Sequence, residues 1–95
     1  MNSIVFKNDK QIYFNQVKGI IEELNDAEEF CSITLRLGHE NSRNVNLVLK
    51  KIQFNPIKEK YKIGDKVCVR YYLSSRKKHD RWYTTATVLD VNFDN

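Results

Sequence analysis

The chain has 95 residues, of which 41% are hydrophobic and 29% are charged, and this predicts one globular domain spanning residues 1–95. No apolar run approaches the roughly 18 residues of a membrane-spanning helix, and the N-terminus lacks the basic region and apolar core of a signal peptide. We therefore expect a cytoplasmic protein without a membrane partner. A chain this short buries a modest core, so a homo-oligomer remains open.

Positive charge is concentrated in one third of the chain. Residues 1–49 carry five Lys/Arg against seven Asp/Glu, residues 50–82 carry eleven against three, and residues 83–95 carry none against two. The formal net charge of +4 therefore combines a central segment at +8 with two flanking segments at −2 each. Such a local excess is the expected footprint of a surface that binds a polyanion.

The N-terminal part predicts strands. Short β-prone runs at Ser3–Phe6 and Gln11–Phe14 indicate a hairpin or an extended arm over residues 1–14. Residues 16–24 predict a further strand, in which Gly19 indicates a bulge or a sharp bend, such as one at a barrel corner.

The next two segments alternate between apolar and polar residues, as strands with one buried face do. In residues 30–37, Phe30 and Arg36 fall on the outward face, and in residues 43–51 Lys50 does so. A turn is predicted between them at residues 38–42. The predicted inward set of the whole domain is Val17, Ile20, Ile33, Leu35, Val45, Leu47, Val67, Val69 and Val88.

Residues 52–63 break the strand rhythm and predict a short helix. Pro56 suits the first turn of a helix, and Asn55 is a plausible cap just before it. Ile57 and Tyr61 lie four residues apart, so they would share one face of the helix.

The last third predicts two strands, Val67–Leu73 and Trp82–Val91, joined by a basic loop at Arg76–Arg81. Gly64-Asp65 is a turn signal just before the first of them. In the second strand, Ala86 and Val88 look internal. This places Trp82 on their side and Tyr83 on the opposite side, unless a bulge reverses the alternation.

Three strands, a short helix and two strands form the order of the five-stranded Greek-key barrel of the oligonucleotide-binding (OB) fold, an all-β fold. In that fold, the helix lies between the third and fourth strands, and here an N-terminal hairpin or arm would be added. The competing architectures are a small SH3-like barrel and an open α+β sheet. Those usually lack a helix at this position or use shorter strands.

The segments KIGDKVCVRYYL and RWYTTATV resemble the last two strands of small phage and bacterial single-stranded DNA-binding proteins of the OB type. In that pattern, Gly-Asp-x-Val opens strand four, a variable basic loop follows, and a segment of Gly or Asp followed by Arg-Trp-Tyr-Thr opens strand five. The close resemblance covers about a third of the chain, at Gly64, Asp65 and Val67 and at residues 80–84. The larger bacterial proteins carry a long tail with an acidic tip after strand five, and the segments that carry the resemblance here imply no recruitment of replication partners through such a tail.

The resemblance implies sequence-tolerant binding of single-stranded DNA, which would protect or organise the strand during replication or recombination. Lys and Arg would bind phosphates in a basic groove, and exposed rings would stack on bases. An RNA-binding OB domain and a protein-interaction or assembly module remain alternatives. For Trp82, the alternative to stacking on bases is a role as a buried core anchor. The candidate contact residues are Arg36, Lys50, Arg70, Tyr72, Arg76, Lys77, Lys78, Arg81, Trp82 and Tyr83.

Neither catalysis nor a cofactor nor a metal site is predicted. His39 and His79 fall in predicted loops beside charged residues, where a histidine is usually solvated. Cys31 and Cys68 are interpreted as small hydrophobes that point to the core, and two cysteines are too few for a disulfide framework. The three glycines are scattered singly and form no phosphate-binding loop.

Overall fold

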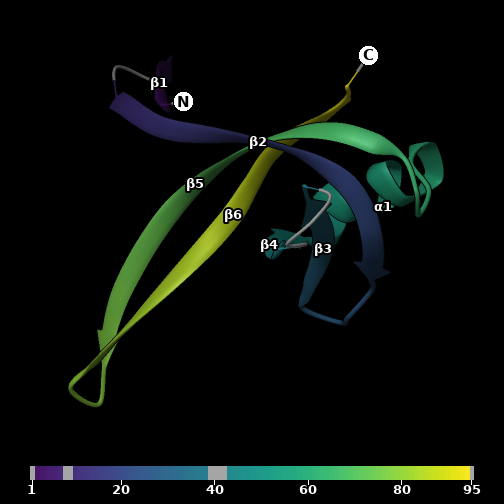
Figure 1. Cartoon of the computed structure of the whole chain (residues 1–95). Helices are drawn as coiled ribbons and strands as arrows, with labels where there is room; N and C mark the ends of the chain where they lie inside the picture. Colours follow the sequence, from purple (N-terminus) through teal and green to yellow (C-terminus); the bar gives the residue numbers. More distant parts are fainter. Residues whose placement is uncertain (1, 8–9, 39–42, 95) are drawn as a thin grey trace.

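The computed structural model describes the backbone of residues 2–7, 10–38 and 43–94, and the side chains of residues 14–38 and 43–94. The predicted turn at residues 38–42, Gly38 apart, and His39 lie outside the described residues. The elements in chain order are β1 (Asn2–Lys7), β2 (Lys10–Asn25), β3 (Phe30–Leu37), β4 (Arg43–Lys50), α1 (Lys51–Lys60), β5 (Lys66–Lys78) and β6 (Arg81–Phe93) (Figure 1).

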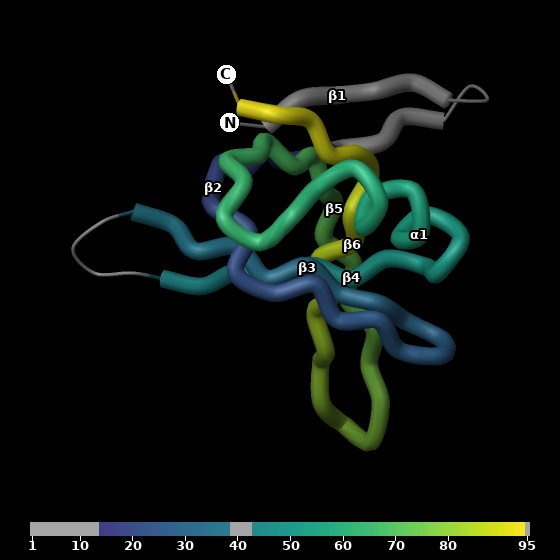
Figure 2. Tube along the Cα trace, turned by 90° about the vertical axis from the view of Figure 1, so that its right-hand side faces the viewer, coloured from purple at the N-terminus to yellow at the C-terminus, as the bar shows by residue number. Residues whose placement is uncertain are grey.

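The strands β2 to β6 form a closed ring. Their order is β2-β3-β4-β6-β5, and β5 pairs back to β2 (Figure 2). The pairs are antiparallel except for β4 and β6, which run parallel where Val48 meets Thr87. Because α1 lies between β4 and β5, the third and fourth strands of the ring, the predicted OB barrel is confirmed. β1 pairs with residues 10–15 of β2 and extends the sheet outside the ring.

β2 is a long strand that has three partners in succession. Residues 10–15 pair with β1, residues 15–20 with β5, and residues 20–25 with β3. Gly19 lies where the partner changes, and a Cβ atom there would lie 2.8 Å from Cδ2 of Leu37 and 2.9 Å from the carbonyl oxygen of Arg36. β2 and β3 therefore approach each other too closely for any side chain at position 19.

The core is formed by the inward faces of the ring strands and by α1. The predicted inward residues that are buried are Ile33, Leu35, Leu47, Val67, Val69 and Val88, and Val17 and Val45 pack against them. The prediction for Ile20 is wrong, since its neighbour Ile21 is the buried residue, with 1% of its surface exposed. The alternation of β2 continues through Gly19, and the bulge comes only after Ile21.

The prediction for Cys68 is also wrong. Cys31 is buried in the core, whereas Cys68 lies between the buried Val67 and Val69 and so faces the opposite way, half-buried. Both cysteines are free thiols.

The helix begins earlier than predicted. α1 starts at Lys51, with Lys50 at the N-cap, so Asn55 is not a cap and Pro56 lies inside the helix. Pro56 has no N–H to donate to the carbonyl of the preceding turn, and α1 continues past that missing bond to Lys60. The helix is tied to the core by Phe54, which is fully buried and which the sequence reasoning did not single out. α1, the one helix among the described residues, is too short and too polar to span a membrane.

Tyr61 follows the last residue of α1 and packs against the end of β6. Its side chain is buried, and its hydroxyl donates a hydrogen bond to the carbonyl oxygen of Val91 at 2.9 Å. Its ring centroid lies 4.6 Å from that of Phe93. The prediction that Ile57 and Tyr61 share one face of the helix is wrong for Tyr61, which follows α1 in an extended conformation, and Ile57 is only half-buried.

β5 and β6 project from the barrel as a two-stranded ribbon, which we define as residues 72–86 (Figure 1). The predicted loop at Arg76–Arg81 is mostly strand, because Lys78 pairs with Arg81. The turn consists of His79 and Asp80, with φ values of 52° and 62°. Two consecutive positive φ values are typical of a type I′ turn, whose twist suits a tight hairpin.

Candidate nucleic-acid interface

An open groove of about 830 Å³ crosses the outward faces of four strands. The strand register shows why these strands share one surface. Ser32 of β3 lies opposite Val48 of β4, Val48 lies beside Thr87 of β6, and Thr87 lies opposite Tyr72 of β5. Side chains that are partners in register lie on the same side of a sheet, so Val48, Thr87 and Tyr72 of this row lie side by side in the floor of the groove. Its lining includes Phe30, Val48, Lys50, Gln53, Tyr72, Ser74, Arg76, Tyr83, Thr85 and Thr87.

Three aromatic rings face the groove. Phe30 comes from β3, Tyr72 from β5 and Tyr83 from β6. Phe30 is 59% exposed and Tyr83 is 50% exposed, which leaves ring surface free for a ligand. Exposed rings along a groove are platforms on which successive bases can stack. The alternation in residues 30–37 predicts that Phe30 faces outward, but the predicted contact residues do not include it. A large ring on an otherwise polar face is the sequence signal that identifies it.

Four of the predicted cations lie on the groove side. Lys50 and Arg76 line the groove itself. Lys78 lines a smaller hollow of about 470 Å³ near the tip of the ribbon, together with Arg76, His79 and Tyr83. Arg81 lies opposite Lys78 in register and therefore on the same face. The groove thus continues toward the tip as a basic surface.

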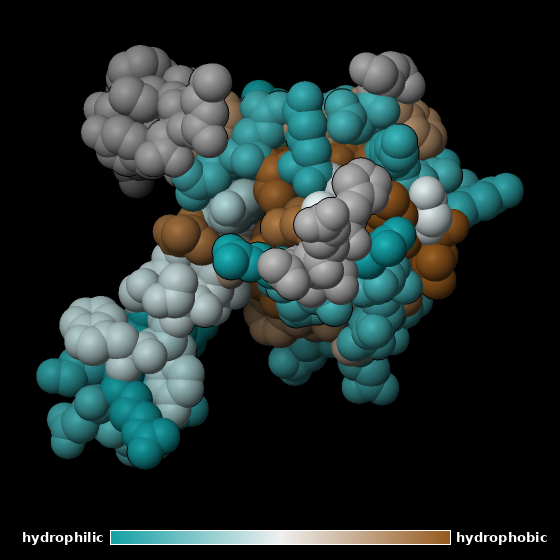
Figure 3. Space-filling model, in the orientation of Figure 1, coloured by the Kyte–Doolittle hydropathy of each residue, from teal (hydrophilic) through white to brown (hydrophobic). Residues whose placement is uncertain are grey.

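Trp82 and Lys77 lie on the other face of the ribbon. They are partners in register, and in each strand both neighbouring residues lie on the groove side, so alternation points these two side chains the other way. The role of Trp82 as a core anchor is excluded, since the residue is 68% exposed. Figure 3 shows the ribbon as a hydrophilic to neutral projection, with the apolar residues gathered over the barrel.

The structure does not bring Arg70 or Arg36 to the groove. The guanidinium group of Arg70 pairs with Asp90, with 2.8 Å between Nε and Oδ1, and lies 5.2 Å from the ring centroid of Phe14. Nε of Arg36 lies 3.8 Å from Oε1 of Glu22, and its register partners are Ile20 and Asn44, at the opposite end of β3 from Phe30. Each of these cations therefore has a carboxylate beside it.

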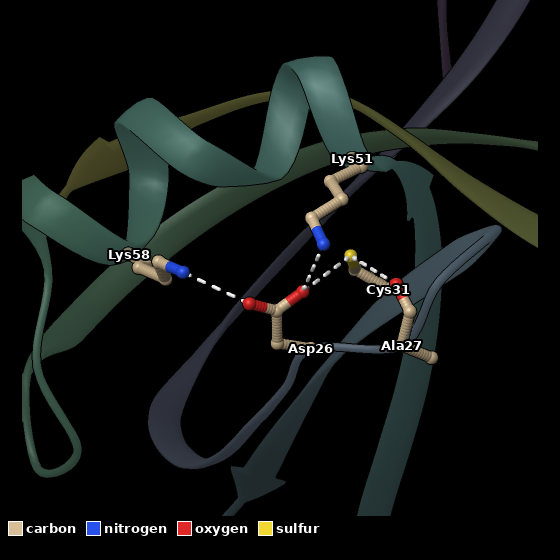
Figure 4. Close-up of polar contacts among 5 residues, drawn as sticks. All are labelled: Asp26, Ala27, Cys31, Lys51 and Lys58. Atoms are coloured by element: carbon tan, nitrogen blue, oxygen red, sulfur yellow. Dashed lines mark hydrogen bonds and ion pairs between the residues drawn. The ribbon is translucent and has the colours of Figure 1, made fainter.

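A charge cluster holds the start of the helix beside the groove (Figure 4). Asp26, in the turn between β2 and β3, accepts a hydrogen bond from Nζ of Lys58 at 2.9 Å, and Nζ of Lys51 lies 3.6 Å from its other oxygen. The hydrogen bond from Lys58 is the main cause that lowers the pKa of Asp26, and the same bond raises the pKa of Lys58. The cluster thus fixes α1, whose first turn carries the groove residue Gln53.

Among the described residues, no group of three or more His, Cys, Asp or Glu side chains could hold a metal ion.

The closed ring, its helix and the groove across β3, β4, β5 and β6 define this chain as an OB-fold protein. Two structures of Rim1, a mitochondrial single-stranded DNA-binding protein from S. cerevisiae, have a similar fold. The first crystal form has a TM-score of 0.69 at 14% identity, covering 84% of this chain and 92% of Rim1. The second has a TM-score of 0.60 at 15% identity, covering 84% and 90%. No family model and no curated protein sequence matches the chain.

Proposed function

We propose that this protein binds single-stranded DNA without strong sequence preference, in the groove across β3, β4, β6 and β5. The observation that carries the proposal is the convergence of three rings and two cations in one open groove. Phe30, Tyr72 and Tyr83 supply the rings, and Lys50 and Arg76 supply the cations. The fold shared with Rim1, a protein named for binding single-stranded DNA, adds independent support.

The chemistry of the groove suits a single strand. Every base has a face that can stack on a ring, so stacking holds the strand with little regard to sequence. Lys50, Arg76, Lys78 and Arg81 would neutralise phosphates and release the counterions condensed on the strand. Binding of this kind serves to protect or organise single strands during replication or recombination, and it requires no catalytic group.

The test is a salt titration of affinity for a dye-labelled oligo-dT, measured by fluorescence anisotropy. We expect the logarithm of the association constant to fall linearly with the logarithm of salt concentration, by about 0.7 per neutralised phosphate. Mixed-sequence DNA should bind with comparable affinity. An affinity that is unchanged between low and physiological salt would contradict the proposal, as would tight binding to only one short sequence.

A matched pair of variants shows whether the salt-dependent binding takes place in the groove. Arg76→Gln removes a cation from the groove, and Lys62→Gln removes an exposed cation from the connection between α1 and β5. Only the first should lower the salt dependence. Parallel titrations with oligo-rU and with duplex DNA decide the class of ligand: preference for oligo-rU would reassign the groove to RNA, and no binding to any nucleic acid would favour an assembly module.

A further inference from the structure

The ribbon presents two faces, and each face carries an aromatic ring beside a cation. On the groove side, Tyr83 is the register partner of Arg76. On the opposite side, which we call the back face, Trp82 is the register partner of Lys77. The same combination that makes the groove suitable for a nucleic acid is therefore repeated on the back face, of which only Ser75 belongs to the lining of the groove.

The back face is open to solvent because the ribbon stands clear of the barrel. β5 pairs with β2 only as far as Tyr71, and β6 pairs with β4 only at Thr87. Within the part of the chain that the structure describes, residues 73–86 pair only with one another, and Tyr72 pairs with Thr87 at the base of the ribbon. Both long edges of the ribbon are thus free of pairing with other β-strands. A flexible single strand of nucleic acid can therefore pass around either edge or around the tip at His79 and Asp80 (Figure 1).

The composition of the back face favours a nucleic acid over a second protein copy. Its exposed side chains include Leu73, Lys77, Trp82 and Thr84, and none of these four lines the groove. Protein interfaces are depleted in Lys, and their cores are depleted in charged residues generally, whereas here Lys77 lies directly beside Trp82. The ribbon also carries four cations, Arg76, Lys77, Lys78 and Arg81, against the single acid Asp80. Two copies paired through this face would bring like charges together.

We propose that the back face is a second contact site for single-stranded DNA. In this arrangement, which rests on the proposed function, one segment of the strand lies in the groove against Tyr83. A following segment passes around the ribbon and stacks on Trp82, with Lys77 beside its phosphate. Tyr83 and Trp82 thus bind different nucleotides of one strand, and the length of strand needed to reach both exceeds that needed to fill the groove.

The experiment uses oligo-dT of increasing length and the fluorescence of Trp82, the only tryptophan, which reports the back face alone. OB folds bind about 4 to 16 nucleotides each, so lengths across that range are compared. We expect the shortest oligonucleotides that bind to leave Trp82 fluorescence nearly unchanged and to lose affinity in Tyr83→Ala. Quenching should appear only above a threshold length. Quenching that is already complete with the shortest oligonucleotide that binds would overturn the proposal.

Three variants of the back face complete the test, with binding measured by the anisotropy of labelled oligonucleotides. Trp82→Ala should weaken binding of long oligo-dT by about 5- to 150-fold, the range for loss of one base–aromatic stack, and should change binding of the shortest by about twofold or less. Trp82→Phe should retain most of the affinity, and Leu73→Ala, which removes an apolar side chain without a ring, should behave as the unmodified protein.

Each remaining outcome is decisive. If Trp82→Ala binds every length as the unmodified protein does, the back face is not a DNA site, while the proposed function still holds. If Trp82→Ala alters the oligomeric state in sedimentation without DNA, the face belongs to a second copy and the proposal fails. If the unmodified protein binds no oligonucleotide of any length, the proposed function fails, and this proposal fails with it.

Discussion

Asp26 and Lys58 form a hydrogen-bonded ion pair with 2.9 Å between carboxylate oxygen and Nζ, and this pair joins the β2–β3 turn to the helix α1. The bond from Lys58 lowers the pKa of Asp26 in the folded protein. A carboxyl group whose folded-state pKa is depressed stabilises the fold above its ordinary pKa, and this contribution is lost as the pH falls through the depressed value. The pKa of Lys58 is raised, so its own contribution is complete below the ordinary pKa of lysine and is lost at alkaline pH above the raised value.

We therefore predict that Asp26→Asn lowers the melting temperature near neutral pH and that its difference from the unmodified protein disappears in acid, where Asp26 is protonated in both folded and unfolded states. Circular dichroism melts at a series of pH values measure this. Glu28→Gln is the control, since it removes an acid from the same turn but not from the cluster. An equal deficit for Asp26→Asn at every pH would show that the ion pair is not its cause.

Phe30 is predicted to be a stacking platform. Because its ring is exposed, Phe30→Ala should leave the melting temperature nearly unchanged and weaken oligo-dT binding by about 1–3 kcal/mol. Phe93→Ala makes the same chemical change at a ring that packs on Tyr61, away from the groove. The control should lose stability and keep affinity. If both variants bind equally well, Phe30 does not contact the bases.

Arg70 is predicted to stabilise the fold rather than to bind DNA, since its charge is already paired with Asp90. Arg70→Gln should lower the melting temperature and leave the slope of the salt titration unchanged. Arg76→Gln should do the reverse, reducing the slope by about 0.7 if it removes one phosphate contact. If Arg70→Gln reduces the slope of the salt titration as much as Arg76→Gln does, Arg70 belongs to the interface.

Gly19 is predicted to tolerate no side chain. In Gly19→Ala, the new methyl group would lie 2.9 Å from the carbonyl oxygen of Arg36, which belongs to the backbone of a paired strand and cannot move without distorting β3. Overpacking of this kind costs about 1–3 kcal/mol. Urea denaturation would measure the loss, and an unchanged free energy of unfolding would mean that β2 and β3 separate easily at this point.

The barrel could be predicted because its strands alternate where one face is buried. The alternation around Ile33 and Leu35 predicts β3 in this way, and the loss of alternation in residues 52–63 predicts the helix. The start of the helix could not be predicted, because Pro56 usually marks a first turn and here lies within α1. Which of Ile20 and Ile21 faces the core could not be predicted either. The answer depends on where the bulge lies, and that position is set by the pairing with β3 and not by the sequence of β2 itself.

The candidate site was predicted in part. Both faces of the ribbon meet solvent, so residues 74–78 show no apolar alternation and read as a loop. The opposite placement of Trp82 and Tyr83 did follow from alternation, because the bulge in β6 lies at Leu89, beyond the ribbon. The pairing of Arg70 with Asp90 was not accessible, since it depends on the register on the far side of that bulge.

The pairing of β2 with β5, which closes the ring and which we call the seam, has a consequence for how the chain folds. Lys78 and Arg81 are partners across a two-residue turn, and a local hairpin of this kind forms in about 1–10 μs. Val17 and Val69, partners across the seam, are separated by about fifty residues, whose loop entropy must be lost before they meet. We expect the ribbon to form early and the seam to close last. Val17→Ala should accordingly speed unfolding while leaving the folding rate nearly unchanged in stopped-flow measurements, because the ring opens first where it closed last.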